Sequence, residues 1–166
     1  MRIAMNKIIV LGPSGAGKSV FSRKLNKITN IPVFHLDNIW WKSDKSHIER
    51  EEFNNKLASI LSKDKWIIDG DYSRTYEIRF QNADTVFFLD YPLDVCLTGA
   101  EERIGKKRED LPWVEEEFDK EFQEWIINWF KNVRPIVYSM IDKYKNNKNI
   151  YIFKSRNDAD NYISNL

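Results

Sequence analysis

The chain has 166 residues and a mass of 19.8 kDa, the size of one domain that could carry a small inserted lid. Hydrophobic residues make up 42% of it and aromatic residues 14%, which is enough apolar surface for a substantial core and excludes a wholly disordered protein. Twenty-six basic residues against 25 acidic ones leave a formal charge of +1, so no large field draws the molecule to nucleic acid or to an anionic membrane.

The cysteine count and the lengths of the apolar runs indicate the cellular compartment in which the protein is expected. The single cysteine, Cys96, can form neither an internal disulfide nor a cysteine metal cluster. The N-terminal segment lacks the charged-then-apolar layout of a signal peptide, and the apolar runs fall far below the roughly 20 residues needed to cross a bilayer. We therefore expect a cytoplasmic protein with no membrane partner.

Short apolar runs alternate with segments of helical period along the chain. Five nearly continuous runs suit strands buried on both faces of a parallel sheet; they are residues 8–11, 33–36, 66–68, 85–89 and 150–153. Apolar residues with helical spacing lie between them, at 20–28, 53–61 and 93–104. This alternation predicts a doubly wound α/β sheet with helices on both faces.

The longest connection lies between the fourth and fifth strands. It begins with a strongly charged segment at 101–110 and continues with an aromatic-rich pattern at 114–130. We interpret this as a mobile flap, with a lid-like segment around 101–113, followed by a long helix. Pro135 removes a backbone donor within the helical region and predicts a kink or break there.

Residues 12–19 carry the most specific motif in the sequence. They read Gly-Pro-Ser-Gly-Ala-Gly-Lys-Ser, which matches the phosphate-binding pattern G-x-x-x-x-G-K-[ST] between the first strand and the first helix. Glycines let successive backbone N–H groups converge on an anion, and the positive end of the following helix adds to the attraction. Lys18 is expected to reach the β- and γ-phosphates of ATP, and the Ser19 hydroxyl to bind Mg²⁺. The residues expected to contact ATP are Gly12, Pro13, Ser14, Gly15, Ala16, Gly17, Lys18, Ser19 and Val20.

Three aspartates follow predicted strands, at the edge where ligands bind in open α/β sheets. Asp69 ends an apolar strand and is predicted to join Ser19 in holding Mg²⁺. Asp37 is predicted to serve the acceptor, with a helix cap or turn as the equally weighted alternative. Asp90 precedes Tyr91-Pro92 and is predicted to be a cap or turn former at a helix start.

Four segments together resemble the bacterial DNA topology modulation proteins, a branch similar to adenylate kinase. They are the 12–19 motif, His35-Leu36-Asp37, residues 66–74 and residues 83–90. The resemblance covers nearly the whole chain. It implies a single domain with the three-layer P-loop kinase-like fold, in which five parallel strands lie in the order 2-3-1-4-5, and ATP with Mg²⁺ as cofactors.

The same resemblance assigns roles to arginines. Adenylate kinases place an arginine on the acceptor phosphate after the third strand; here Arg74 comes one residue later, and Asp71 adds a negative charge that disfavours AMP. Arg103 and Arg108 resemble lid residues that bring positive charge to the transferred phosphoryl, with solvated residues at a helix end as the alternative. The segment lacks the lid cysteines of zinc-binding adenylate kinases, so no structural metal is expected.

These observations predict an ATP-dependent phosphotransferase that moves the γ-phosphoryl to a small-molecule acceptor. Its predicted catalytic residues are Lys18, Asp37, Arg74, Arg103 and Arg108. The alternative is a nucleic-acid-associated regulator of DNA topology that uses nucleotide binding as a switch, although the balanced charge would keep any nucleic-acid binding weak.

The acceptor is expected between the ends of the second and third strands, faced by Asp37, Arg74 and Arg79. If the acceptor is a hydroxyl, Asp37 is the carboxylate best placed to take its proton. If it is a nucleoside monophosphate, no base is needed and Arg74 should dominate binding.

Overall fold

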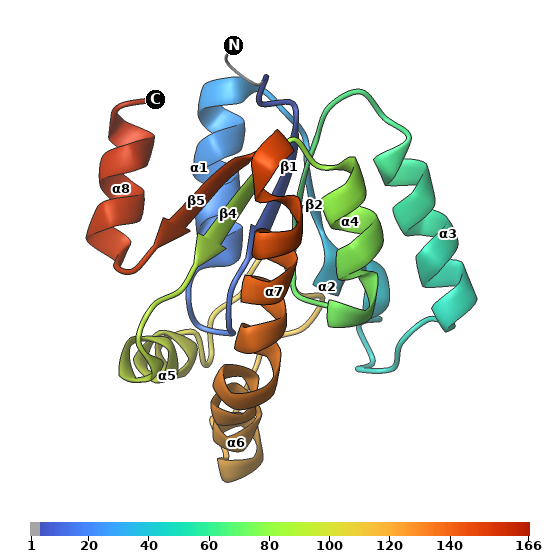
Figure 1. The fold of residues 1–166 in the computed structure, drawn as a ribbon. Helices are drawn as coiled ribbons and strands as arrows, with labels where there is room; N and C mark the ends of the chain where they lie inside the picture. Colours follow the sequence, from blue (N-terminus) through green and yellow to red (C-terminus); the bar gives the residue numbers. More distant parts are fainter. Residues whose placement is uncertain (1–3) are drawn as a thin grey trace.

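A computed structural model describes residues 4–166 and shows a five-stranded parallel sheet with helices on both sides (Figure 1). The strands are β1 (Lys7–Leu11), β2 (Val33–His35), β3 (Trp66–Asp69), β4 (Thr85–Leu89) and β5 (Asn149–Phe153). They lie in the order β2-β3-β1-β4-β5, and each neighbouring pair is parallel. The predicted α/β class and strand order are confirmed.

Helices cover the two faces in distinct groups (Figure 1). The helices are α1 (Lys18–Thr29), α2 (Leu36–Trp40), α3 (Arg50–Leu61), α4 (Tyr76–Asn82), α5 (Leu93–Glu102), α6 (Lys120–Asn128), α7 (Arg134–Tyr144) and α8 (Arg156–Ser164). Because side chains alternate along a strand, Ile9 and Leu11 of β1 pack under α3, α4 and α7, whereas Ile8 and Val10 pack under α1 and α8. Both faces of the central strand are therefore fully buried, which explains its continuous apolar run.

The predicted long helix is divided. Helix α6 begins only at Lys120, because the Asp119 side chain caps it by accepting a hydrogen bond from the Phe122 N–H at 2.8 Å. A π-helical turn at Trp129–Val133 then separates α6 from α7. The predicted break is therefore present, but it lies before Pro135, which occupies the first turn of α7, where a missing N–H leaves no bond unmade.

Asp90 follows β4 and does not cap α5, whose flanking residue is Pro92, so the predicted capping role is wrong. Asp90 is 5% exposed, and its carboxylate accepts hydrogen bonds from Arg134 Nε at 2.8 Å, from Lys154 Nζ at 2.6 Å and from the Tyr138 hydroxyl. Burial raises the pKa of this carboxyl, but the three partners outweigh burial and lower it to about 2. The cluster fastens α7 and the segment after β5 to the end of the sheet.

Replacing Asp90 by asparagine should lower the free energy of unfolding by about 2 kcal/mol at neutral pH, the value of a pKa depressed from 3.8 to about 2. Because the folded-state pKa is depressed, this stabilisation is present above about pH 4 and is lost as the pH falls towards about 2. Urea unfolding of both proteins across this range checks it. Asp64→Asn, at an exposed turn, is the control and should change little. Equal losses in the two variants would contradict the assignment.

Within residues 4–166, none of the helices combines the length and apolar character required to span a bilayer.

Candidate active site

The 12–19 motif forms a tight loop between the end of β1 and the start of α1. Helix α1 begins at Lys18, directly after Gly17, whose backbone is left-handed with φ of 91°. The Lys18 ammonium lies at the mouth of this loop and donates a hydrogen bond to the Pro13 carbonyl at 3.1 Å. The geometry places the positive end of α1 and the Lys18 charge at one point, as a phosphate site requires.

The loop is fixed from behind by two other parts of the chain. At Gly15, which has φ of +85°, an added Cβ would lie 1.9 Å from the Cys96 carbonyl oxygen, so only glycine allows α5 to approach this closely. Arg156, the first residue of α8, donates hydrogen bonds to the Gly15 carbonyl at 2.8 Å and to the Ala16 carbonyl at 3.0 Å. Sequence reasoning missed Arg156, because no motif marks it.

A cavity of about 840 Å³ opens against this loop. It is bounded by the loop, the segment after β2, the segment after β3, the lid-like segment continued to Glu115, and α6 with the π-helical turn that follows it. Residues from these five parts that line it include Ser14, Lys18, Asp37, Trp40, Trp41, Asp71, Tyr72, Arg103, Arg108, Trp113, Glu115, Phe122, Trp125 and Trp129. Of the predicted catalytic residues, Lys18, Asp37, Arg103 and Arg108 are therefore brought together around one space.

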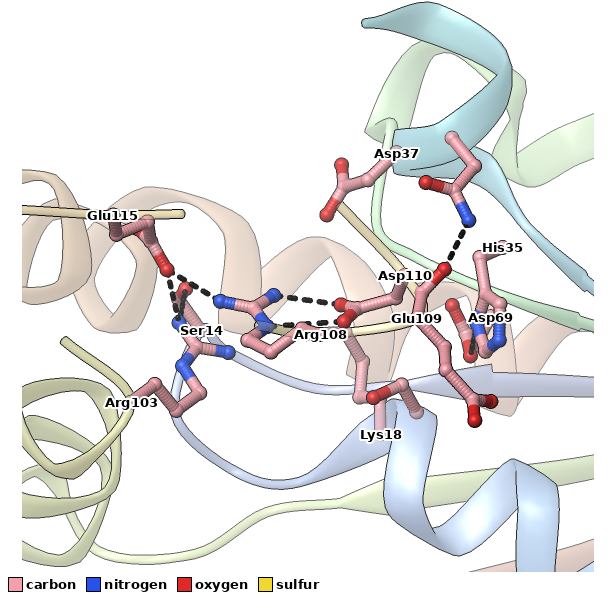
Figure 2. Close-up of polar contacts among 12 residues, drawn as sticks. Ser14, Lys18, His35, Asp37, Asp69, Arg103, Arg108, Glu109, Asp110 and Glu115 are labelled. Carbon is pink, nitrogen blue, oxygen red and sulfur yellow. Dashed lines mark hydrogen bonds and ion pairs between the residues drawn. The ribbon is translucent and has the colours of Figure 1, made fainter. Parts of the chain in front are cut away.

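Asp37 lies in the first turn of α2 and faces this cavity together with Lys18 (Figure 2). One of its carboxylate oxygens accepts a hydrogen bond from the Tyr72 hydroxyl at 2.6 Å. Tyr72 has a left-handed backbone, with φ of 45°, an uncommon conformation for a residue with a side chain. Burial raises the pKa of Asp37, while the Tyr72 hydroxyl and the Lys18 charge lower it; the net shift is upward. A carboxylate of raised pKa beside the phosphate loop is chemically suited to accept a proton.

Asp69 and His35 form a buried pair at the ends of β3 and β2, where the two residues stand in register. The His35 Nδ1 and Asp69 Oδ2 atoms are 2.6 Å apart, and Asp69 is 5% exposed. Burial lowers the pKa of His35, but the hydrogen bond and the charge of Asp69 outweigh it and the net pKa is raised. Ser19, the other predicted magnesium ligand, accepts a hydrogen bond from Arg23 Nη1 at 3.3 Å.

The lid-like segment brings its two arginines to the phosphate loop, as Figure 2 shows. Arg103 donates a hydrogen bond from Nη2 to the Ser14 hydroxyl at 3.1 Å, and its buried Nε has no hydrogen-bond partner among the residues that the structure describes. Arg108 binds both oxygens of Asp110, at 3.0 and 2.6 Å, and also pairs with Glu115. Their side chains are 26% and 15% exposed, so the alternative of freely solvated arginines is wrong. The acidic partners Asp110 and Glu115 were not predicted.

The two arginines predicted to face the acceptor lie elsewhere. Arg74 is exposed; it donates from Nη1 to the Asn54 side chain at 2.8 Å, and its guanidinium lies over the Phe53 ring at 5.0 Å. Arg79 is 0% exposed and donates to the Gly70 carbonyl at 2.9 Å and to the Asp71 carbonyl. The prediction for Arg79 is wrong, because its charge holds the loop after β3 in place.

Comparisons with known proteins agree with this architecture. No protein-family model matches the chain. Shikimate kinase from Bacteroides thetaiotaomicron superposes with a TM-score of 0.66 at 20% identity, over 98% of this chain and 97% of that one. Shikimate kinase from Acinetobacter baumannii, solved with shikimate, gives 0.62 at 16% identity, over 98% and 91% of the two chains. The chain has the fold of the P-loop kinases.

Two curated relatives are similar in sequence. The adenylate kinases of Thermotoga petrophila and Thermotoga maritima are each 30% identical over 95 residues, which is 55% of this chain and 42% of the relative. The match thus spans less than half the length of these relatives. The likeness to the DNA topology modulation proteins finds no support among these kinases.

Proposed function

We propose that the protein is an ATP-dependent phosphotransferase that moves the γ-phosphoryl group to a hydroxyl of a small molecule. The observation that carries the proposal is that Lys18 of the phosphate loop and the Asp37 carboxylate line one cavity. Lys18 supplies positive charge for the phosphate groups of ATP, and Asp37 can take the proton of the acceptor hydroxyl. One cavity therefore holds the groups that phosphoryl transfer requires on the donor side and on the acceptor side.

The phosphate side of the cavity fits ATP. The Arg103 Nε is a buried donor that no residue in the described part of the chain accepts from, an arrangement that costs free energy until an acceptor such as a phosphate oxygen reaches it. The Lys18 ammonium donates its hydrogen bond to the neutral Pro13 carbonyl, which a phosphate oxygen can replace. Together with the start of α1, these groups would hold the β- and γ-phosphates.

Mg²⁺ would be held by the Ser19 hydroxyl and the Asp69 carboxylate. Oxygen donors of this kind suit Mg²⁺, which takes most of its remaining ligands from water and substrate phosphates. Within residues 4–166 no group of three or more His, Cys, Asp or Glu side chains is arranged to hold a metal ion. The ion would neutralise charge on the transferred group.

In the proposed transfer, the acceptor hydroxyl oxygen forms the new bond to the γ-phosphorus, the bond from that phosphorus to the β,γ-bridging oxygen breaks, and ADP leaves. The hydroxyl proton passes to the Asp37 carboxylate. Tyr72 holds that carboxylate through its hydroxyl and so positions it. Arg103 and Arg108 approach from the lid, where they would stabilise charge on the departing phosphates.

A calorimetric titration with ATP and Mg²⁺, followed by a screen of ATP consumption against nucleosides, nucleotides and small hydroxy compounds, tests the proposal. We expect nucleotide binding and hydroxyl-dependent ATP consumption. A folded protein that does not bind ATP would overturn it. The shikimate and adenylate kinases named above give no support to the nucleic-acid regulator alternative.

Arg103→Ala should weaken ATP binding by about 10- to 100-fold, because it removes charge-assisted hydrogen bonds worth roughly 1.5–3 kcal/mol. Calorimetry measures the change. Arg50→Ala is the matched control, since Arg50 is an exposed arginine at the start of α3 that does not line the cavity. Similar affinities for wild type and Arg103→Ala would exclude a nucleotide role for this lid arginine.

A further inference from the structure

The cavity carries its positive and negative charges in different places. Its cationic lining residues are Lys18 in the phosphate loop and Arg103 and Arg108 in the lid, and both arginines lie within 4 Å of Glu115. The segments after β2 and β3 contribute Asp37 and Asp71 and no cation to the lining. Helix α6 and its cap add Asp119, Glu121 and Glu124. Beyond the phosphate site, the lining is therefore acidic.

The arginines that could reverse this charge are committed to other partners. Arg79 is fully buried against backbone carbonyls of the loop after β3. Arg74 is exposed and does not line the cavity; it donates to Asn54, and its guanidinium lies over the Phe53 ring at 5.0 Å and over the Trp40 ring at 5.9 Å. An acceptor phosphate or carboxylate would thus meet Asp37 and Asp71 without a compensating cation, at a cost in Coulomb repulsion.

Aromatic rings supply most of the remaining wall. Five of the six tryptophans line the cavity, namely Trp40, Trp41, Trp113, Trp125 and Trp129. Trp41 and Trp113 meet edge to face, with ring centroids 5.4 Å apart, which joins the segment after β2 to the lid. Trp129 is 5% exposed, and no residue within 4–166 accepts a hydrogen bond from its buried indole N–H. A buried donor of this kind favours a ligand that brings an oxygen.

We propose, on the basis of the phosphotransferase function above, that the acceptor is a hydroxylated organic cation, an amine or quaternary ammonium compound without phosphate or carboxylate groups. Tryptophan faces attract organic cations through their quadrupole, and the acidic lining adds charge attraction. One hydroxyl of the acceptor meets Asp37 for transfer, and another oxygen accepts from the Trp129 indole N–H. The same wall repels nucleoside monophosphates and acidic sugars.

Three probes of one scaffold test this charge preference on the wild-type protein: benzyltrimethylammonium, benzyl alcohol and benzoate. Five tryptophans in the cavity wall make intrinsic fluorescence a direct readout of occupancy. At constant ionic strength, the cation should bind about 5- to 30-fold more tightly than the alcohol, corresponding to a cation–π and charge contribution of roughly 1–2 kcal/mol, and benzoate should bind most weakly. Benzoate binding as tightly as the cation, or no binding of the cation, overturns the inference.

Asp71→Asn removes the negative charge of this side chain and keeps its shape. The asparagine oxygen can still accept the hydrogen bonds that Asp71 receives from the Gly12 N–H and the Tyr76 hydroxyl, so the loop should keep its form. We expect benzyltrimethylammonium binding to weaken about 3- to 10-fold and benzyl alcohol binding to stay unchanged. Asp64→Asn, an exposed aspartate outside the lining, should alter neither. Equal weakening by both variants would contradict a local role.

A parallel titration with ATP distinguishes this inference from the function on which it rests. ATP binding with no preference for the cationic probe would refute the acceptor class and leave the phosphotransferase intact. Preference for the cation without ATP binding would refute the phosphotransferase instead.

Discussion

Lys18→Ala should lower phosphoryl transfer by roughly 10²–10³-fold, the scale of losing one preorganised charge at a developing anion. Lys18 is the only one of the predicted catalytic residues on the loop itself, and its Nζ donates to the Pro13 carbonyl at 3.1 Å, a neutral acceptor that a phosphate oxygen can replace. Calorimetry with ATP and Mg²⁺, together with steady-state rates on an accepted hydroxy compound, measures the loss.

Lys27→Ala is the matched control for this experiment. Lys27 lies in the last turn of the same helix, is exposed and does not line the cavity. It should leave both nucleotide affinity and rate unchanged. If Lys18→Ala, shown to be folded by circular dichroism, behaves like Lys27→Ala, the phosphate site is assigned wrongly.

Asp37→Asn should lower kcat by about 10²–10⁴-fold and change KM little, because a general base acts in the transition state and contributes little to ground-state binding. The asparagine retains an oxygen for the Tyr72 hydroxyl, so the change removes the proton acceptor and keeps the geometry. Steady-state kinetics with a hydroxyl acceptor separates the two constants. Robust AMP phosphorylation that is indifferent to Asp37→Asn would contradict a hydroxyl acceptor.

The pH dependence of the wild-type rate gives a second test of Asp37. Burial raises the pKa of this carboxyl, so its base form is lost at a higher pH than for an exposed aspartate as the solution is acidified. The rate should therefore fall on the acid side through this raised pKa, and Asp37→Asn should remove that limb. Tyr72→Phe deletes the hydroxyl whose hydrogen bond lowers the pKa of Asp37, so the acid limb of the rate profile should move to higher pH. Most of the affinity for ATP should remain.

The same upward shift has a consequence for stability. A carboxylate with a raised folded-state pKa destabilises the fold at any pH above its unfolded pKa, because burial disfavours its charged form. Asp37→Asn should therefore raise the free energy of unfolding at neutral pH while it lowers kcat. Opposite changes in stability and activity are typical of a residue retained for function.

The strands and the phosphate loop could be predicted because their signals are local. A parallel strand buried on both faces needs a continuous apolar run, and each of the five runs matches a strand to within about one residue at either end. The conformation of the loop at residues 12–19 is determined locally, by glycines at fixed positions and by the helix that follows directly. The positions of the two aspartates follow from the strands, since Asp69 ends β3 and Asp37 comes two residues after the end of β2.

The partners of charged residues could not be predicted in this way. Asp90 binds Arg134 and Lys154, which are 44 and 64 residues away, so no local pattern distinguishes it from a cap. Arg79 follows β3 at a position where an arginine could contact the acceptor, but its side chain lies in the core. It donates there to the Gly70 carbonyl of the loop after β3, a buried backbone acceptor that needs a donor. The lid role of Arg103 and Arg108 stays a prediction, and their pairing with Asp110 and Glu115 could not be predicted because it depends on how residues 103–115 fold back.

The contact from Arg156 to the phosphate loop joins residues 140 and 141 positions apart in the chain. A ribosome makes Gly15 and Ala16 early and Arg156 only near the end, so the loop passes most of the time of synthesis without the donor that fixes its carbonyls. The sheet can form four of its strands in that interval, since only β5 comes late. Strand β5 ends three residues before Arg156, so the last strand of the sheet and the donor that fixes the 12–19 loop are made at nearly the same time, and the sheet and the loop should be completed together.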